Sequence, residues 1–120
     1  MKIPILLPNI FDHPFTYKSS KANLKLGDYV EVPFGKSKKI GIVWDEFEKN
    51  NNKKYLIKNI IRKLEIPSIN LETIKFLKWF SEYNLVPIGM SLKLHLLSNE
   101  AIETQNKNEI QKYNTFKKPN

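Results

Sequence analysis

Short runs of apolar residues, several of them alternating with polar ones, fill the first third of the chain. Residues 3–7 are mostly apolar, which predicts a strand buried on both faces. Residues 15–17 (FTY) and 29–32 (YVEV) alternate between apolar and polar, as a strand with one buried face does. These patterns predict three short strands in this part of the chain.

Residues 33–38 (PFGKSK) are rich in turn-forming residues and lead into the β-branched run 40–44 (IGIVW). Together with residues 29–32 they predict a β-hairpin with a basic tip. The polar stretch 46–54 is expected to be an exposed loop. The isoleucines of residues 55–63 then favour another strand.

A helical period begins after Pro67 and Ser68, which interrupt the strand pattern. Asn70 is a good N-cap, and Glu72 in the first turn complements the helix dipole. Apolar residues at 71, 74, 77 and 80 predict an amphipathic helix of about three and a half turns. The aromatic residues Phe76, Trp79 and Tyr83 are expected to widen its buried stripe. A second short helix is predicted over residues 90–97.

These elements predict an α+β fold, with a small β-sheet or partly open barrel of about five short strands followed by two helices. Residues 1–97 are expected to form one domain, since 120 residues leave little room for a second core. Residues 98–120 contain few apolar positions and predict a polar tail or linker.

Composition excludes several kinds of chemistry. The absence of cysteine rules out disulfides, a cysteine zinc site and a cysteine nucleophile, and two histidines are too few for a histidine metal site. We therefore predict no metal site and no catalytic residues. No apolar run is long enough to span a membrane, and the first residues make a poor signal peptide, so a cytoplasmic location is expected.

The net charge of +8 favours a polyanionic partner, although 19 of the 20 basic residues are Lys, a bias that AT-rich coding also produces. The distribution of the charge is more informative than its total. Residues 18–63 hold 12 basic and 5 acidic side chains, whereas the rest of residues 1–97 is neutral. The charge thus lies on one contiguous stretch, as a binding face requires.

The predicted hairpin tip is the best candidate site. Its Gly-Lys-Ser at 35–37 is not a nucleotide-hydrolysing P-loop, because Val30 stands where a further glycine is needed and no helix follows. Gly35 instead lets backbone N–H groups approach a phosphate or a terminal nucleotide, with Lys36, Lys38 and Lys39 around it. The alternative is that this is only a solvated hairpin turn.

The motifs also resemble a known family. Residues 15–17 (FTY), 27–36 (GDYVEVPFGK), 40–43 (IGIV) and 87–89 (PIG) are similar, in that order, to the amino-terminal domain of the primosomal replication-restart helicases, the PriA family. The resemblance covers residues 3–97. It implies a domain that binds the 3′ end of the nascent leading strand at stalled or branched forks without choosing among bases.

The family's pocket, carried over position by position, implies DNA 3′-end-binding roles for a small set of residues. Phe15 would pack beside the base or sugar, Gly35 would offer its backbone, and Lys58 would supply charge. Thr16 stands where many family members have Asp, so the contact there would be arranged differently. The full predicted set is Phe15, Thr16, Tyr17, Gly35, Lys36 and Lys58.

The resemblance further implies a module that is not itself an enzyme, because the family's helicase core is absent from this chain. No cofactor is expected here, since the ATP, Mg and Zn of the family bind outside this region. The implied partners are DNA, other primosome proteins and single-strand-binding protein. The resemblance also implies that the protein is a monomer and is associated with the nucleoid.

Two other functions stay open on the residues alone. A small β-barrel could bind a protein segment along a hairpin edge and have no nucleic-acid function. An RNA-binding version of the β-domain is a third possibility, which the 2′-hydroxyl would distinguish.

Overall fold

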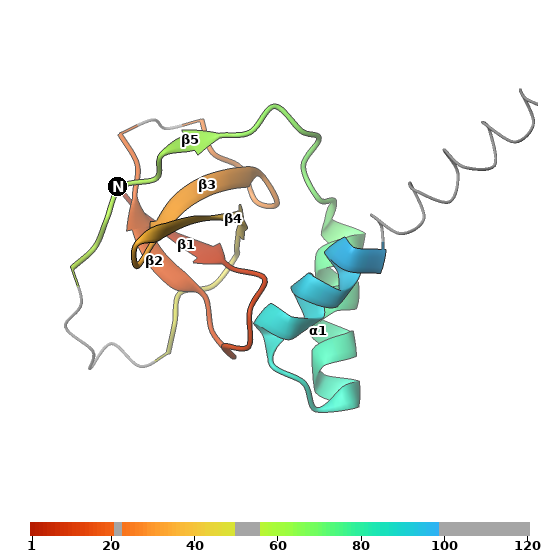
Figure 1. The fold of residues 1–120 in the computed structure, drawn as a ribbon. Helices are drawn as coiled ribbons and strands as arrows, with labels where there is room; N and C mark the ends of the chain where they lie inside the picture. The colour runs from red at the N-terminus through yellow and green to blue at the C-terminus, as the bar shows by residue number, and fades with distance from the viewer. Residues whose placement is uncertain (21–22, 50–55, 99–120) are drawn as a thin grey trace, which may run out of the picture.

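The protein is described by a computed structural model that places residues 1–20, 23–49 and 56–98. Five antiparallel strands form one sheet in the order β2-β1-β4-β3-β5 (Figure 1). The elements are β1 (Lys2–Leu6), β2 (Phe15–Lys18), β3 (Tyr29–Phe34), β4 (Ser37–Val43), β5 (Arg62–Lys63) and α1 (Leu71–Asn84). A second helix covers residues 88–98. The α+β fold with about five short strands and two helices is therefore confirmed.

The sheet curls so that one extended segment reaches both of its sides. The N–H of Lys18, at the end of β2, donates to the carbonyl of Lys58 (2.9 Å), and the N–H of Ile60 donates back to Lys18 (2.8 Å). One residue later, the N–H of Ile61 donates to the carbonyl of Glu31 on β3 (2.8 Å). Residues 58–61 thus bridge β2 and β3, which gives the sheet its barrel-like shape.

Two apolar clusters, one on each face of the sheet, make up the core. The first lies inside the curled sheet and contains Ile3, Ile5, Leu7, Tyr17, Val30, Val32 and Val43. The second lies between the sheet and the helices and contains Leu6, Ile42, Trp44, Ile69, Ile74, Leu77 and Leu92. Because side chains alternate along a strand, β1 contributes to both clusters and is buried on both faces, as its apolar run predicted.

The predicted start of α1 is confirmed by its cap geometry, and the structure adds where the helix ends. The side-chain Oδ1 of Asn70 accepts a hydrogen bond from the N–H of Thr73 (2.8 Å), so Asn70 is the N-cap of α1. At the other end, Leu85 takes a left-handed conformation with φ of 54°, and its N–H donates to the carbonyl of Glu82. Leu85 therefore ends the helix where a glycine is usual.

Two local predictions were wrong. Only Arg62–Lys63 of the expected strand 55–63 forms a regular strand, because the segment before it crosses from β2 to β3; residues 50–55 lie outside the described part. The second error concerns α1, where Phe76, Trp79 and Tyr83 are 49%, 54% and 73% exposed. The sheet and helix 88–98 cover only the opposite side of α1, so these rings do not widen the buried stripe.

The expected polar tail, residues 98–120, lies outside the described residues apart from residue 98, which belongs to the second helix. In the described part of the chain, no helix combines the length and the apolar character needed to span a membrane.

Candidate functional site

The turn between β3 and β4 leaves open space over its glycine. Gly35 has a φ of 61°, a conformation that L side chains rarely adopt, and a Cβ added to it would meet no atom within 4 Å. A Cβ on Gly41 or Gly89, by contrast, would come within 3 Å of backbone oxygens. Packing therefore explains those two glycines, whereas the space over Gly35 is free for a ligand.

An aromatic cluster adjoins this turn. Phe34, directly before Gly35, makes an edge-to-face contact with Phe15 at the start of β2, with ring centroids 5.4 Å apart. Phe11 also meets Phe15 edge-to-face at 5.4 Å, and His13 lies 4.9 Å from Phe15. The rings fix the position of Phe15 and place it beside the Gly35 turn, although the two are 20 residues apart in the sequence.

Tyr17 lies deeper than the other predicted site residues. Its ring is buried in the cluster inside the sheet, and its hydroxyl donates to the carbonyl of Pro33 at 2.8 Å. This bond joins β2 to the end of β3 just before the Gly35 turn. Tyr17 is therefore placed to hold the two walls of the site together rather than to contact a ligand directly.

The remaining predicted residues surround the turn and the edge strand. Thr16 is half-buried on β2, and strand alternation directs it away from the face that carries Phe15 and Tyr17. Lys36 is exposed at the turn. Lys58 is also exposed, while its carbonyl accepts the hydrogen bond from Lys18 that attaches this segment to β2.

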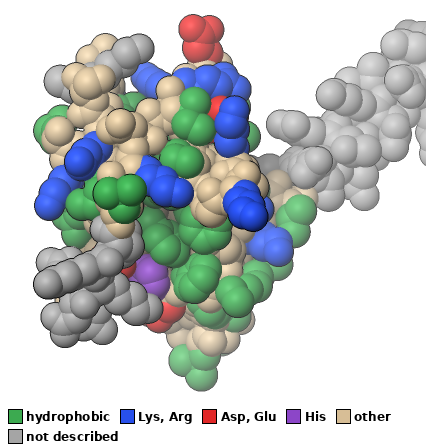
Figure 2. Space-filling model, turned by 60° about the vertical axis from the view of Figure 1, so that its left-hand side comes forward, with side chains coloured by type: hydrophobic (Ala, Val, Ile, Leu, Met, Phe, Trp, Pro, Cys, Tyr) green, Lys and Arg blue, Asp and Glu red, His purple; other side chains and the backbone are tan. Residues whose placement is uncertain are grey.

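Positive charge dominates the surface near these residues. Lys18, Lys36, Lys38, Lys39 and Lys58 are all exposed. On the face shown in Figure 2, Lys and Arg side chains lie among hydrophobic ones, and acidic side chains are few. Charge combined with exposed apolar groups suits a ligand that offers both phosphates and flat rings.

Two acidic residues at the adjoining edge of the sheet, Glu31 and Asp28, form ion pairs with basic residues of β5. Glu31 lies 3.6 Å from Arg62. The buried Asp28 accepts hydrogen bonds from the Ser68 hydroxyl and the Lys25 N–H and lies 3.5 Å from Lys63. Burial raises the pKa of Asp28, but these hydrogen bonds and the Lys63 ammonium outweigh burial and hold that pKa below its usual 3.8. Asp28 stays ionised and ties the loop before β3 to β5.

Sequence reasoning did not single out Phe11 and His13 as part of the site. Residues 8–14 lie between two of the predicted strands, and the sequence signal that marks them is the spacing Phe11, His13, Phe15, which repeats every second residue. No group of three or more His, Cys, Asp or Glu that could hold a metal ion occurs in the described ranges.

A curled antiparallel sheet with a basic surface and an aromatic-lined hairpin turn defines a class: a small β-domain that binds nucleic acid. Comparison with known families makes this specific. Residues 3–96 match the family described as the 3′ DNA-binding domain (3′BD) of PriA, and the chain belongs to this family. The predicted family is thereby confirmed.

Similarity to curated proteins supports the same family assignment. The replication restart protein PriA of Rickettsia typhi is 34% identical over 117 residues, which are 96% of this chain and 18% of that protein. The PriA proteins of Rickettsia prowazekii and Rickettsia conorii are 37% and 35% identical over 79% and 77% of this chain. The chain spans 14–18% of the length of these relatives.

These matches confirm the predicted function at the level of the domain. The chain is a 3′ DNA-binding domain of the replication-restart type, with DNA as its partner, and it is a binding module rather than an enzyme. A protein-interaction module without a nucleic-acid function is not favoured.

Proposed function

We propose that this domain captures the 3′ end of the nascent leading strand at stalled or branched replication forks, and that the terminal nucleotide sits over Gly35 beside Phe15. The observation that carries the proposal is the open space over Gly35 next to an aromatic ring that its neighbours hold in place. A strand that ends there can fill this space, whereas a continuing strand must leave it again. The open space over Gly35 beside Phe15, which we call the pocket, therefore recognises that the strand has ended.

The surrounding residues have different roles in this proposal. Phe15 gives the base or sugar an apolar wall, and the Gly35 backbone makes the close approach. Lys36 and Lys58 attract the phosphates. The Thr16 hydroxyl, which can both donate and accept a hydrogen bond, faces away from Phe15 and so serves only a part of the strand that reaches the other face of β2. Tyr17 positions the site through its bond to Pro33. Ring contacts, backbone groups and charge do not read base edges, so binding is independent of sequence.

The length of the relatives supports a wider proposal. We infer that the domain works within a restart helicase whose ATP, magnesium and zinc sites lie in other regions. There it acts as a monomeric unit, at the nucleoid, alongside other primosome proteins and single-strand-binding protein. Residues 98–120 would link the domain, residues 1–97, to the rest of such a protein.

The decisive experiment compares single strands of identical sequence that differ only at the 3′ terminus. Fluorescence anisotropy of 5′-labelled oligonucleotides should show tighter binding to a 3′-hydroxyl than to a 3′-phosphate, since the phosphate adds bulk and charge inside the pocket. Changing the terminal base should have little effect. Equal affinity for the two ends would contradict the pocket while leaving general DNA binding intact.

A variant pair tests the role of Phe15. Stacking of a base on an aromatic side chain contributes about 1–3 kcal/mol, so Phe15→Ala should weaken binding of the 3′-hydroxyl strand by about fivefold or more. Phe76→Ala is the matched control, because Phe76 is an exposed ring on α1, away from the Gly35 turn. Unchanged affinity of a folded Phe15→Ala domain at fixed salt would remove Phe15 from the site.

A further inference from the structure

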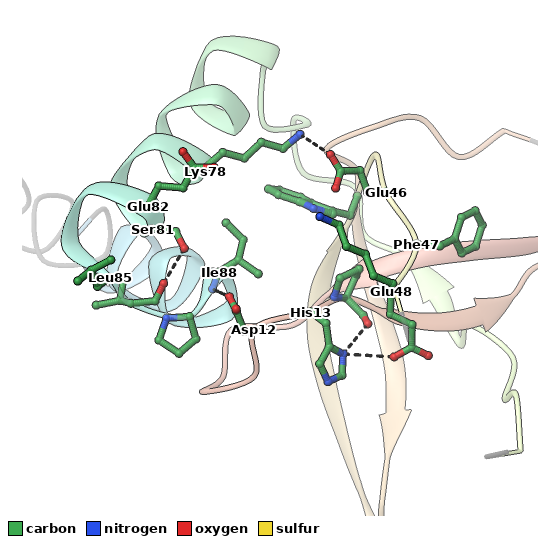
Figure 3. A pocket seen from close by; sticks show the side chains of 15 residues that line it. Asp12, His13, Glu46, Phe47, Glu48, Lys78, Ser81, Glu82, Leu85 and Ile88 are labelled. Atoms are coloured by element: carbon green, nitrogen blue, oxygen red, sulfur yellow. Dashed lines mark hydrogen bonds and ion pairs between the residues drawn. The ribbon is translucent and has the colours of Figure 1, made fainter. Parts of the chain in front are cut away.

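A second concave region lies between the sheet and the end of α1 (Figure 3). This cleft has a volume of about 880 Å³ and is lined by residues 12–14, 44, 46–49 and parts of 78–88. Gly35, Lys36 and Lys58 do not line it. His13 lines the cleft and also touches Phe15 of the proposed DNA site, so the two regions meet at one edge.

Carboxylates gather at this cleft, in contrast to the rest of the basic chain. Four carboxylates line it: Asp12, Glu46, Glu48 and Glu82. Among the lining residues there are two lysines, Lys49 and Lys78. Lys78 reaches across from α1 to the carboxylate of Glu46 (Figure 3), and its ammonium also pairs with the carboxylate of Asp45. The cleft is therefore net negative in a chain of net charge +8, and it repels a DNA backbone.

The rim of the cleft carries exposed apolar side chains, and one of these residues, Leu85, has a strained backbone. Leu85 is 91% exposed and lines the cleft, and Phe47, which also lines it, is half-exposed. Leu85 also holds a φ of 54°, which costs an L residue about 1–2 kcal/mol and which a glycine would adopt without that cost. Its side chain packs against almost nothing in the free domain, so packing within the domain does not explain a leucine at this position.

We propose that this cleft is a protein-docking site that takes a short peptide segment carrying Lys or Arg next to aliphatic side chains. The basic groups pair with the exposed carboxylate of Glu82 and share the exposed carboxylate of Glu46 with Lys78, which lies 3.5 Å from it. The aliphatic groups cover Leu85 and Phe47. Charge complementarity selects this occupant, since an acidic peptide or a nucleic acid meets like charge at the same surface. Such a site lets a partner protein bind while the DNA site stays open.

Nuclear magnetic resonance titration of the ¹⁵N-labelled chain tests the proposal with defined probes. The first probe is a ten-residue peptide of alternating Leu and Lys, the second its Leu and Glu counterpart, and the third a single-stranded oligonucleotide. The Leu and Lys peptide should shift resonances of residues 12–14, 44–49 and 78–88. The oligonucleotide should shift those around residues 15–17 and 34–39 instead.

Charge-reversal variants provide the control. Glu82→Lys should weaken binding of the Leu and Lys peptide by about fivefold or more, equivalent to about 1 kcal/mol, because it replaces an attractive contact with a repulsive one. Glu65→Lys makes the same charge change at an exposed position outside the cleft and should leave peptide affinity unchanged. Leu85→Gly should lower peptide affinity while raising the melting temperature.

Three results would overturn the proposal. Equal binding of the Leu and Glu peptide would show that charge does not select the occupant. Equal weakening by Glu65→Lys would show only non-specific attraction, and cleft shifts caused mainly by the oligonucleotide would assign the cleft to DNA.

Discussion

Gly35 offers the sharpest test of the DNA site, because the structure separates the effect of a side chain on folding from its effect on binding. A Cβ at this position meets nothing within 4 Å, so Gly35→Ala introduces no clash in the free domain. The cost that remains is the φ of 61°, about 1–2 kcal/mol for an L residue. For a domain of this size, that lowers the melting temperature by about 4–8 °C per kcal/mol.

Binding should respond more strongly than folding. If the terminal nucleotide packs against the Gly35 backbone, the added methyl group occupies space that the nucleotide needs. Overpacking of a tight contact costs about 1–3 kcal/mol, so affinity for a 3′-hydroxyl strand should fall by about tenfold. Gly35→Asn separates the two effects further, since Asn tolerates the left-handed conformation yet blocks the pocket more completely.

Anisotropy titrations at one salt concentration, paired with thermal melts, measure both quantities. The 3′-phosphate strand is the internal control, because it does not use the pocket and its affinity should hardly change. A folded Gly35→Ala or Gly35→Asn domain that binds the 3′-hydroxyl strand as tightly as the parent would refute the assignment of the open space to the DNA terminus.

Three further predictions concern charge, pH and packing. Lys58→Ala should leave the melting temperature unchanged, since the Lys58 carbonyl keeps its bond to Lys18, and should reduce the slope of log affinity against log salt by about one; an unchanged slope would remove Lys58 from the phosphate contacts. Because the folded pKa of Asp28 lies below its unfolded value of 3.8, Asp28 stabilises the fold above about pH 4 and loses this effect as pH falls through the folded pKa. Melts from about pH 7 to about pH 3 should therefore show a smaller loss of stability for Asp28→Asn than for the parent, and parallel curves would contradict this. Leu77→Ala, in the cluster between α1 and the sheet, should reduce the free energy of unfolding in urea by about 2–5 kcal/mol, whereas the exposed Phe76→Ala should change it by about 0.5 kcal/mol or less; similar losses would mean that the two faces of α1 are misassigned.

Local interactions account for what could be predicted about the fold. The N-cap at Asn70 and the β-hairpin around Gly35 depend on residues within a few positions of one another, so their signals are present in the sequence. The same holds for the buried run of β1. The family motifs reinforced these elements, because they lie on the strands and turns that the apolar pattern had already marked.

Segments without a local partner could not be predicted in the same way. Residues 55–63 have the composition of a strand, but a strand also needs a free edge to pair with, and here the chain divides its hydrogen bonds between β2 and β3. The spacing of Phe76, Trp79 and Tyr83 shows which residues share a side of α1. It does not show which side the sheet will cover.

By itself, the sequence determined the order of strands and helices, the basic stretch 18–63 and the family that the motifs resemble, because each depends on neighbouring residues or on composition. Only the tertiary structure decided that Phe11, His13, Phe15 and Phe34 meet beside the open turn at Gly35. It also decided that carboxylates from three separate segments gather at the cleft beneath Leu85. The physical reason is that burial and contact depend on which distant elements the chain brings together, and residue spacing alone does not specify them.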